Sequence, residues 1–399
     1  MRRKTRFVCV SDTHGYTPSE AGFKLPAGDV LIHAGDLTNN GSMSELRRTM
    51  DWISKADFEI KILVAGQFIF LFFDVTQWLF SNHDVSLDPE FYAKHGHTFH
   101  GQKLEDPQQC IDIVTGAAPS VIFLQHQAVT IRLTRENGPR TAFTVFGSPF
   151  SQFKGSWAFG YESSKAMALW DQIPPNVDIV VTHTPPQHLC DRKPDGSFVG
   201  CNSLRQTLSR IRPPLAICGH VHEGRGYRRV RWRDASMEDT QHNEATETGE
   251  GADRFIDVPL PPRGSKKLNL IDLTGKRGDR LDSYGFACEV PGLQPLSETT
   301  NMRVIPLLDS TGSAAVAVPD EQRKRANESF SISSSSSTGD RSLECLSSPR
   351  KETCILNAAI VATSWPHLGG KQFNAPIVVD IELPEWWPLS DRENDLGEN

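Results

Sequence analysis

Short apolar runs recur along the first 232 residues of the chain, and polar or helix-forming segments separate them. The runs predict strands over residues 7–10, 30–34, 60–65, 121–124, 129–133, 141–147, 177–182 and 214–218. Several are apolar at every position, which is typical of strands covered on both faces. Between them, the capping-box pattern of Ser42 and Glu45 predicts a helix to about Ala56, and residues 163–170 and 201–210 are further predicted helices. Alternation of this kind favours an α/β architecture with functional groups at the carboxyl ends of strands.

The pattern changes after Arg233. Residues 234–253 are acidic and almost free of apolar side chains, and residues 275–351 are polar and include the serine-rich run 331–338. Neither segment carries enough apolar surface to build a core, so we predict an acidic loop and a disordered Ser-rich segment. Strand-like runs return at 268–273, 354–361 and 376–383, with too little apolar material to fold alone. We therefore expect one domain over residues 1–384 and a tail over residues 385–399.

One apolar window, residues 62–80, is long and hydrophobic enough to resemble a membrane span. Asp74 lies inside it, and Gln67 and Gln77 add further polar cost, so we expect no membrane-spanning segment. We also expect no secretory signal, because the chain starts directly with a strand-like run. The eight cysteines are scattered without a CxxC pair, so we expect reduced thiols and a cytoplasmic protein.

Composition narrows the classes of function. Only 38% of the 399 residues are hydrophobic, which fits a globular part joined to polar segments that do not pack. The formal net charge of −7 argues against general nucleic-acid binding through a basic surface.

Seven potential metal ligands are spread along the chain, most of them just after predicted strands. They are Asp12, His14, Asp36, Asn82, His183, His220 and His222. Carboxylate, imidazole and amide groups at the ends of parallel strands are suited to a two-metal hydrolytic site. Each motif alone has an ordinary alternative, since Gly-Asp is common in turns and short polar sequences occur in loops. Their joint occurrence, in this order and at strand ends, favours a metal site.

The chain resembles the calcineurin-like metallophosphoesterase superfamily, whose motifs are DxH, GD, GNH(D/E), an isolated histidine and GHxH. Further stretches are similar to a subgroup of metallophosphoesterase domain-containing proteins related to class III cyclic-nucleotide phosphodiesterases: GSPF at 147–150, GSWAF at 155–159, THTPP at 182–186 and CGHVHEGRG at 218–226. The resemblance covers roughly residues 4–232 and resumes at 268–274 and 354–384. It implies a four-layer α/β/β/α sandwich and a small phosphoester substrate, with nucleotides as the favoured class.

The resemblance also implies a binuclear centre with two divalent metal ions. One ion would bind Asp12, His14, Asp36 and His222, and the other would bind Asp36, Asn82, His183 and His220. A nitrogen and oxygen ligand set without thiolate suits Mn, Fe or Zn. Members of the family hydrolyse phosphodiester or phosphomonoester bonds by attack of a metal-bridging hydroxide. His83 would act as general acid or as donor to a phosphate oxygen, and Asp84 would orient neighbouring groups.

One departure from the family pattern lies ahead of Asn82. The family motif has asparagine directly after glycine, whereas here residues 67–81 separate Gly66 from Asn82. Removing residues 67–81 restores Gly-Asn-His-Asp, which suggests the hypothesis of a retained intron translated in frame. As genuine protein, the insertion would loosen the geometry around Asn82 and His83. A non-catalytic scaffold of the same fold is therefore the alternative function, and a regulatory protein phosphorylated on its serine tract is a third reading.

Overall fold

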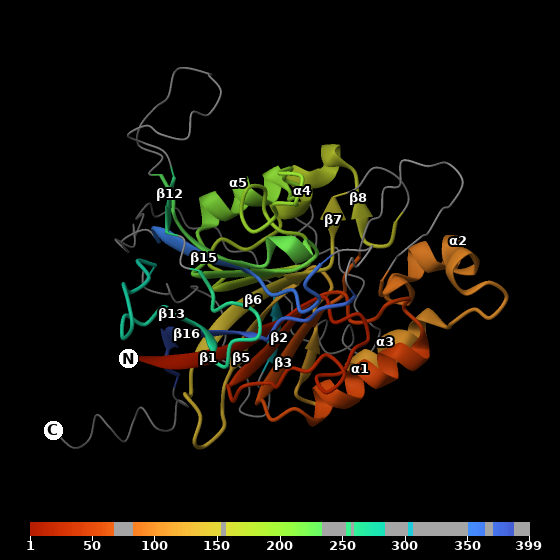
Figure 1. The fold of residues 1–399 in the computed structure, drawn as a ribbon, viewed down its shortest axis with the longest axis horizontal. Coiled ribbons are helices and arrows are strands. Elements are labelled where there is room, and N and C mark those ends of the chain that lie inside the picture. The colour runs from red at the N-terminus through yellow and green to blue at the C-terminus, as the bar shows by residue number, and fades with distance from the viewer. Residues whose placement is uncertain are drawn as a thin grey trace, which may run out of the picture.

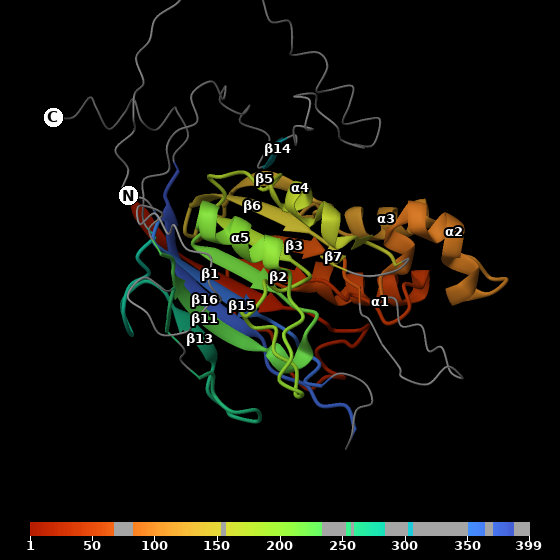
Figure 2. The ribbon, with the colours of Figure 1, turned by 90° about the horizontal axis from the view of Figure 1, so that it is seen from above.

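Two β-sheets pack face to face at the centre of the molecule, and helices cover their outer faces (Figure 1, Figure 2). The structure is a computed structural model. It describes residues 1–67, 83–152, 157–233, 253–256, 259–283, 302–305, 350–363 and 370–386.

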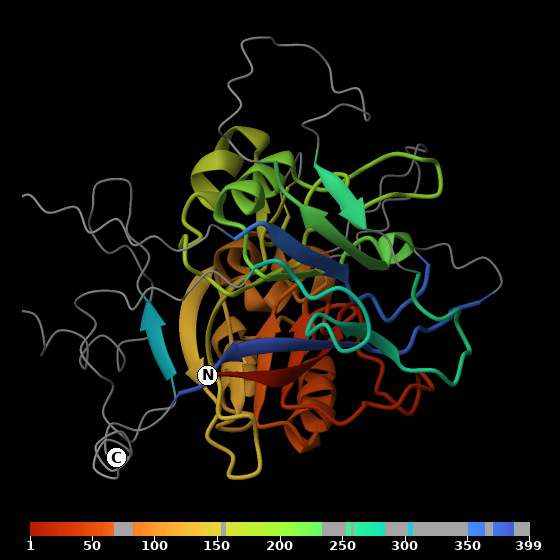
Figure 3. The same ribbon diagram turned by 90° about the vertical axis from the view of Figure 1, so that its left-hand side faces the viewer.

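The first sheet has the strand order β13-β16-β1-β2-β3-β4. Its parallel part consists of β1 (Arg2–Val10), β2 (Val30–Ala34), β3 (Ile60–Val64) and β4 (Val121–Phe123). β16 (Ile377–Pro384) pairs antiparallel with β1, and β13 (Asn269–Asp272) lies on its far side. Figure 3 shows β1 in red beside β16 in blue, so the first and last strands of the domain are neighbours. Because β1, β2 and β3 are parallel, the segments that follow them leave the sheet at the same edge.

The second sheet has the strand order β12-β11-β15-β10-β9-β6-β5-β14. Its parallel part consists of β6 (Ala142–Ser148), β9 (Ile179–Thr182), β10 (Leu215–Cys218) and β15 (Glu352–Asn357). The antiparallel strands are β5 (Gln127–Arg132), β11 (Gly226–Arg231), β12 (Arg254–Ile256) and β14 (Met302–Ile305). A separate pair, β7 (Ser151–Gln152) and β8 (Gly160–Tyr161), follows β6.

Helices form the two outer layers. The first sheet is covered by α1 (Met43–Lys55), α2 (Pro89–His100) and α3 (Pro107–Thr115), and the second by α4 (Ala166–Trp170) and α5 (Asn202–Ile211). Single turns of 3₁₀ helix occur at η1 (Val85–Leu87), η2 (Ser163–Lys165) and η3 (His222–Gly224).

Three apolar clusters fill the three interfaces between these layers. Alternate residues of β2 point to opposite faces, so Ile32 packs between the sheets with Val145, whereas Leu31 packs under α1 with Leu46. The third cluster holds Leu204 of α5 against the outer face of the second sheet. Strands buried on both faces explain the continuous apolar runs in the sequence, and the four-layer α/β/β/α sandwich implied by the resemblance is confirmed.

The elements predicted from the sequence are present, with their ends shifted by a few residues. Ser42 caps α1 as predicted, and both hydrogen bonds of the capping box with Glu45 are formed. The predicted helix over 163–170 divides into η2 and α4. Helices α2 and α3 were not predicted, although Asp88 and Asp106 each stand as N-cap before a proline, which is a recognised start signal. Residues 302–305, inside the segment predicted to be disordered, pair with β5 as β14.

Several predictions fall on residues outside the described ranges. They concern most of the insertion 67–81, most of the acidic loop 234–253, much of the segment 275–351 and the tail beyond residue 386. Within the described ranges, no helix has the length and apolar character needed to cross a membrane. The six cysteines that the structure describes have free thiols, as expected.

Candidate metal centre

The polar motifs of the sequence gather where strands of both sheets end. Asp12 follows β1, Asp36 follows β2 and Gly66 follows β3 of the first sheet, while His183 follows β9 and His220 follows β10 of the second. The sandwich therefore brings together side chains that are as much as two hundred residues apart in the sequence, as the contact between His14 and His222 illustrates.

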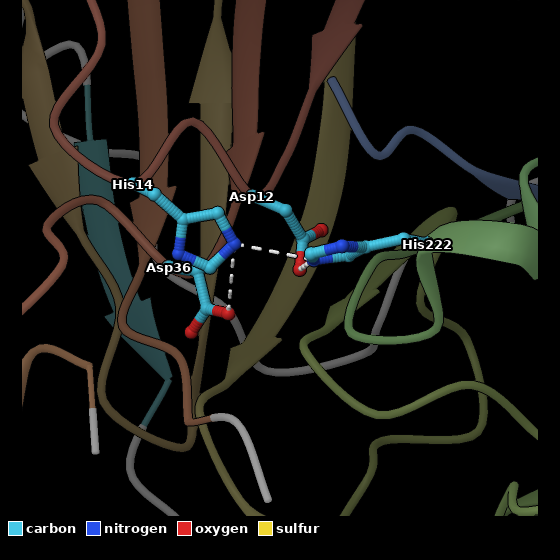
Figure 4. A group of neighbouring side chains, drawn as sticks. All are labelled: Asp12, His14, Asp36 and His222. Carbon is cyan, nitrogen blue, oxygen red and sulfur yellow. Dashed lines mark hydrogen bonds and ion pairs between the residues drawn. The ribbon is translucent and has the colours of Figure 1, made fainter. Parts of the chain in front are cut away.

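Asp12, His14, Asp36 and His222 form a buried cluster that could hold a metal ion (Figure 4). Each offers one ligand atom, and these four atoms lie within 4.8 Å of one another. Nε2 of His222 is 3.3 Å from Oδ1 of Asp12, and Nε2 of His14 is 3.8 Å from Oδ2 of Asp36. The two imidazoles approach each other to 3.2 Å between their Nε2 atoms, so nitrogen and oxygen atoms converge on one point.

His183 and His220 lie on the other side of Asp36. Nε2 of His183 is 3.3 Å from Oδ1 of Asp36, and the ring centroids of His183 and His220 are 5.0 Å apart. Nδ1 of His183 donates to the carbonyl oxygen of Ala34 at 2.9 Å, which fixes the ring and turns Nε2 toward Asp36. The carboxylate of Asp36 thus presents one oxygen to each group of imidazoles, as a ligand shared by two cations would.

The main chain adopts uncommon conformations at four of these residues. Asp12, His14, Asp36 and His220 have φ angles of 53°, 46°, 55° and 69°, in the left-handed region that non-glycine residues seldom occupy. Backbone hydrogen bonds hold these turns: the N–H of Asp12 donates to the oxygen of Gly35 at 2.9 Å, and that of His14 to the oxygen of Asp36 at 3.0 Å. Strained backbone of this kind concentrates at functional sites, where surrounding structure imposes it.

The environment of Asp36 fits a bound cation. Both of its carboxylate oxygens are buried, and neither accepts a hydrogen bond within the described part of the chain. A buried carboxylate without such partners is costly, and a divalent cation beside it removes that cost. Burial, together with the negative charges of Asp12 and Asp84, raises the pKa of Asp36 well above its usual value. Carboxylate oxygens and imidazole nitrogens without thiolate form a donor set suited to Mn, Fe or Zn.

Three of the imidazoles are held in the neutral form that metal binding requires. Burial lowers the pKa of His14 and of His183, and it lowers that of His220 to about 3. Asp12 and His222 behave as a pair: burial opposes their charged forms, but the hydrogen bond between them outweighs it. The pKa of Asp12 is therefore below its usual value and that of His222 above it.

His83 also reaches this centre. Its Nε2 is 4.0 Å from Oδ2 of Asp36, and its ring centroid is 4.2 Å from that of His14. Its Nδ1 donates to the carbonyl oxygen of Asn39 at 2.6 Å, and burial lowers its pKa to about 3.

Asp84 ties two strand ends together from within the protein. Its carboxylate accepts hydrogen bonds from the N–H groups of Leu37 and Gly66 at 3.0 and 2.9 Å, and from the N–H and hydroxyl of Thr38 at 2.9 and 2.7 Å. Burial raises its pKa to about 6. These contacts are those expected of a residue that orients the loop carrying Asp36.

Asn82 lies outside the described residues, so its place relative to the centre is not part of the structure. In the sequence, Gly66 is followed directly by Gln67, and this residue is fully buried.

Close approach of backbone to ligand atoms explains two motif glycines. A Cβ atom at Gly219 would lie 1.9 Å from Oγ of Ser11 and 2.3 Å from Oδ2 of Asp12. One at Gly66 would lie 2.2 Å from the main-chain nitrogen of Asp36. Any larger residue at either position would displace a side chain or main-chain atom of the centre.

Sequence reasoning missed Asn357, a buried residue that braces the turn carrying His220 and His222. Its Nδ2 donates to the carbonyl oxygens of Val221 at 2.8 Å, Cys190 at 3.1 Å and Gly219 at 3.2 Å, and its Oδ1 accepts from the N–H of Ala359 at 3.1 Å. The signal that could have identified it is the one that identified Asp12, namely a polar residue at the end of an apolar strand.

Comparison with known proteins places the fold and the cluster in a family. The family model for calcineurin-like phosphoesterases matches residues 5–224. Human metallophosphoesterase domain-containing protein 1 is 34% identical over 228 residues, which are 56% of this chain and 62% of that protein. The matched region thus spans less than two thirds of the human relative.

Two further relatives differ in how much of them is matched. A UPF0046 protein of Caenorhabditis elegans is 27% identical over 272 residues, or 66% of this chain and 84% of that protein. A probable rhamnogalacturonate lyase C of Emericella nidulans is 34% identical over 240 residues, or 58% of this chain but only 19% of that protein.

The matched residues 5–224 cover more than half of the chain and include the four residues of the buried Asp/His cluster. Fold, cluster and family match agree, and the chain belongs to the calcineurin-like phosphoesterase family.

Proposed function

We propose that this protein is a binuclear, metal-dependent phosphoesterase that hydrolyses phosphodiester or phosphomonoester bonds. The observation that carries the proposal is the buried carboxylate of Asp36, which has imidazoles on two sides and no hydrogen-bond donor on either oxygen within the described residues. One Mn, Fe or Zn ion would lie among Asp12, His14, Asp36 and His222, and another beside Asp36, His183 and His220. Nucleotides are the favoured substrate class because the stretches at 147–150, 182–186 and 218–226 resemble the cyclic-nucleotide phosphodiesterase-like subgroup.

Bound cations would neutralise charge on the phosphoryl oxygens and supply a nucleophile at neutral pH. The protein's own contribution is positional. Asp84 holds the loop of Asp36 to the end of β3, and Asn357 holds the turn of His220 and His222. Because the cluster is buried, its electrostatic interactions are stronger than they would be in water.

His83 is proposed to assist the leaving group. Its Nδ1 proton is engaged by Asn39, so Nε2 is the nitrogen that faces Asp36. Burial keeps the ring neutral, and an anionic phosphoryl group beside Nε2 would favour its protonation. A proton held at Nε2 can then pass to the departing oxygen.

The substrate is proposed to be a small phosphoester. The protein itself is proposed to bind neither a membrane nor nucleic acids in general. The free thiols of the described cysteines support a cytoplasmic location.

A non-catalytic scaffold of the same fold is the second candidate. The observation that favours it is the interrupted motif, since residues 67–81 stand between Gly66 and Asn82. Metal content and turnover separate the two candidates, because a scaffold needs neither.

The substitution Asp36→Asn tests the enzyme directly. It removes the anionic ligand shared by both groups of imidazoles, so we expect loss of bound Mn²⁺ and a fall in turnover on the order of 100-fold or more. Metal analysis of the purified protein and hydrolysis of bis(p-nitrophenyl) phosphate provide the two measurements.

The matched control is Asp112→Asn on the exposed face of α3, where the carboxylate accepts a hydrogen bond from Gln108 of the same helix. It should behave as wild type. Wild-type protein that binds no metal and shows no turnover would instead favour the scaffold.

Cation binding is expected to release a proton from Asp36. In the metal-free protein the raised pKa of Asp36 keeps this carboxyl protonated at pH values where an ordinary aspartate is ionised. A cation must displace that proton and also the proton that the raised pKa of His222 favours, so the apparent affinity for Mn²⁺ should fall as the pH drops. Calorimetric titrations in mildly acidic buffers of different ionisation enthalpy count the released proton. A pH-independent affinity would show that Asp36 is already ionised and His222 already neutral.

Replacement of His83 by alanine separates its role from metal binding. We expect both cations to remain and kcat to fall by about 10²–10⁴-fold. Esters with a poor leaving group should lose more than p-nitrophenyl esters, which need no proton on departure. The exposed His97 of α2 provides a matched His→Ala control with unchanged kcat. An equal loss for good and poor leaving groups would assign His83 a structural role.

Deletion of residues 67–81 is expected to improve the enzyme. The deletion joins Gly66 to Asn82 and shortens the connection between β3 and His83, which tightens the geometry of the centre. We expect the affinity for the second cation to rise by about tenfold, with a parallel gain in turnover. Equal metal content and turnover in the two forms would refute the expected impairment.

A further inference from the structure

Gln67 occupies the position that asparagine holds in the family motif, directly after Gly66. The main chain just before Gln67 is held in place, because the N–H of Gly66 donates to Oδ2 of Asp84 at 2.9 Å. Gly66 itself is packed against the main chain of Asp36 and the ring of His183. The main chain at Gln67 is therefore positioned by the same contacts that position Asp36.

The carbonyl oxygen of Gln67 points into the group formed by His183 and His220. It lies 2.9 Å from Nε2 of His183, and the ring of His220 contacts the Gln67 backbone as well. Nε2 of His183 is also 3.3 Å from Oδ1 of Asp36. A neutral imidazole carries one ring proton, so only one of the two carbonyl contacts of His183 can be a hydrogen bond. With the proton on Nδ1, shared with Ala34, the lone pair of Nε2 faces two oxygen atoms.

These spacings are those of neighbouring ligands on one cation. Two ligands about 2.1 Å from a metal ion and at right angles to each other are about 3 Å apart. The separations of 2.9 and 3.3 Å from Nε2 of His183 to the two oxygens agree with that arrangement. A cation among the three atoms would turn a contact between lone pairs into an attractive one.

The side chain of Gln67 gives a second, independent indication. Its amide nitrogen and oxygen are both buried, and no described residue supplies either with a hydrogen-bond partner. Burial of an amide without partners is unfavourable in a purely structural position. A polar residue buried in this way beside Asp36 and His183 fits the border of an ion site.

We propose that Gln67 takes the place of Asn82 at the second cation, with its main-chain carbonyl oxygen as the ligand beside Oδ1 of Asp36 and Nε2 of His183. Asn82 is then dispensable for cation binding. The insertion leaves the number of ligands complete, and the gain expected from deleting residues 67–81 comes from the shorter connection to His83 and not from a missing ligand. The inference rests on the proposed function, because it assumes that the centre binds two cations.

The first test compares Mn²⁺ binding by the full-length wild type, Asn82→Ala and His183→Ala, measured by equilibrium dialysis with metal analysis. Asn82→Ala should keep two ions per chain, with an affinity change far below the roughly 10–100-fold loss seen when support of a metal ligand is removed. His183→Ala should lose the second ion and serves as the positive control. Loss of the second ion in Asn82→Ala overturns the proposal.

A matched pair of deletions gives the second test. Deletion of residues 68–82 joins Gln67 to His83, whereas deletion of residues 67–81 joins Gly66 to Asn82, so the two products differ only in glutamine or asparagine after Gly66. Both should bind two Mn²⁺ ions. Two ions in the second variant but one in the first would show that an asparagine side chain is required.

Anomalous scattering from crystals of the Mn²⁺-loaded full-length protein locates the ligand directly. The second Mn²⁺ should contact the carbonyl oxygen of Gln67, and contact with Asn82 in its place overturns the proposal. A single ion among Asp12, His14, Asp36 and His222 would overturn it while leaving a metal-dependent enzyme standing. A protein that binds no Mn²⁺ would overturn the proposed function as well.

Discussion

The constraint on which the rest of the structure depends is the burial of one carboxylate, that of Asp36, among imidazoles and without a hydrogen-bond donor in the described part of the chain. Such an arrangement is unfavourable in a folded protein unless a positive charge offsets it. The surrounding protein is built to maintain it. Asp84 anchors the loop on one side, and on the other the carbonyl oxygen of Gly35, next to Asp36, accepts a hydrogen bond from the N–H of Asp12. Four residues of the centre accept a left-handed backbone so that their side chains can converge.

Both sheets contribute residues to the centre. The first sheet supplies Asp12, His14 and Asp36, and the second supplies His183, His220 and His222. Contacts across the boundary fix the sheets relative to each other: Nδ1 of His183 donates to Ala34, and the N–H of His220 donates to the carboxylate of Asp12 at 3.0 Å. The apolar cluster between the sheets holds this register, because a shift of either sheet would separate the imidazoles from the carboxylates.

The insertion after β3 illustrates how such a centre tolerates added sequence. Asp84 binds Gly66 on one side of the insertion and lies next to His83 on the other, so both ends are held at the centre by one carboxylate. The residue that follows Gly66 then occupies the place beside His183 whatever its identity, since a main-chain carbonyl is present at every position. Because every residue has a main-chain carbonyl, a main-chain ligand is less sensitive to sequence change than a side-chain ligand.

The sequence by itself determined most of the strands of both sheets, the capped start of α1 and the identity of the carboxylates and imidazoles that meet in the centre. These features depend on local signals, namely apolar periodicity, capping residues and polar groups at strand ends. Only the tertiary structure showed that Asn357 braces the turn of His220, that β14 adds to the edge of the second sheet, and that Gln67 stands beside His183. In the sequence, the family motif is restored only when residues 67–81 are removed. In the folded protein, the residue that follows β3 and Gly66 lies in the centre. The packing of the two sheets fixes the position of this residue, and no local sequence pattern encodes it.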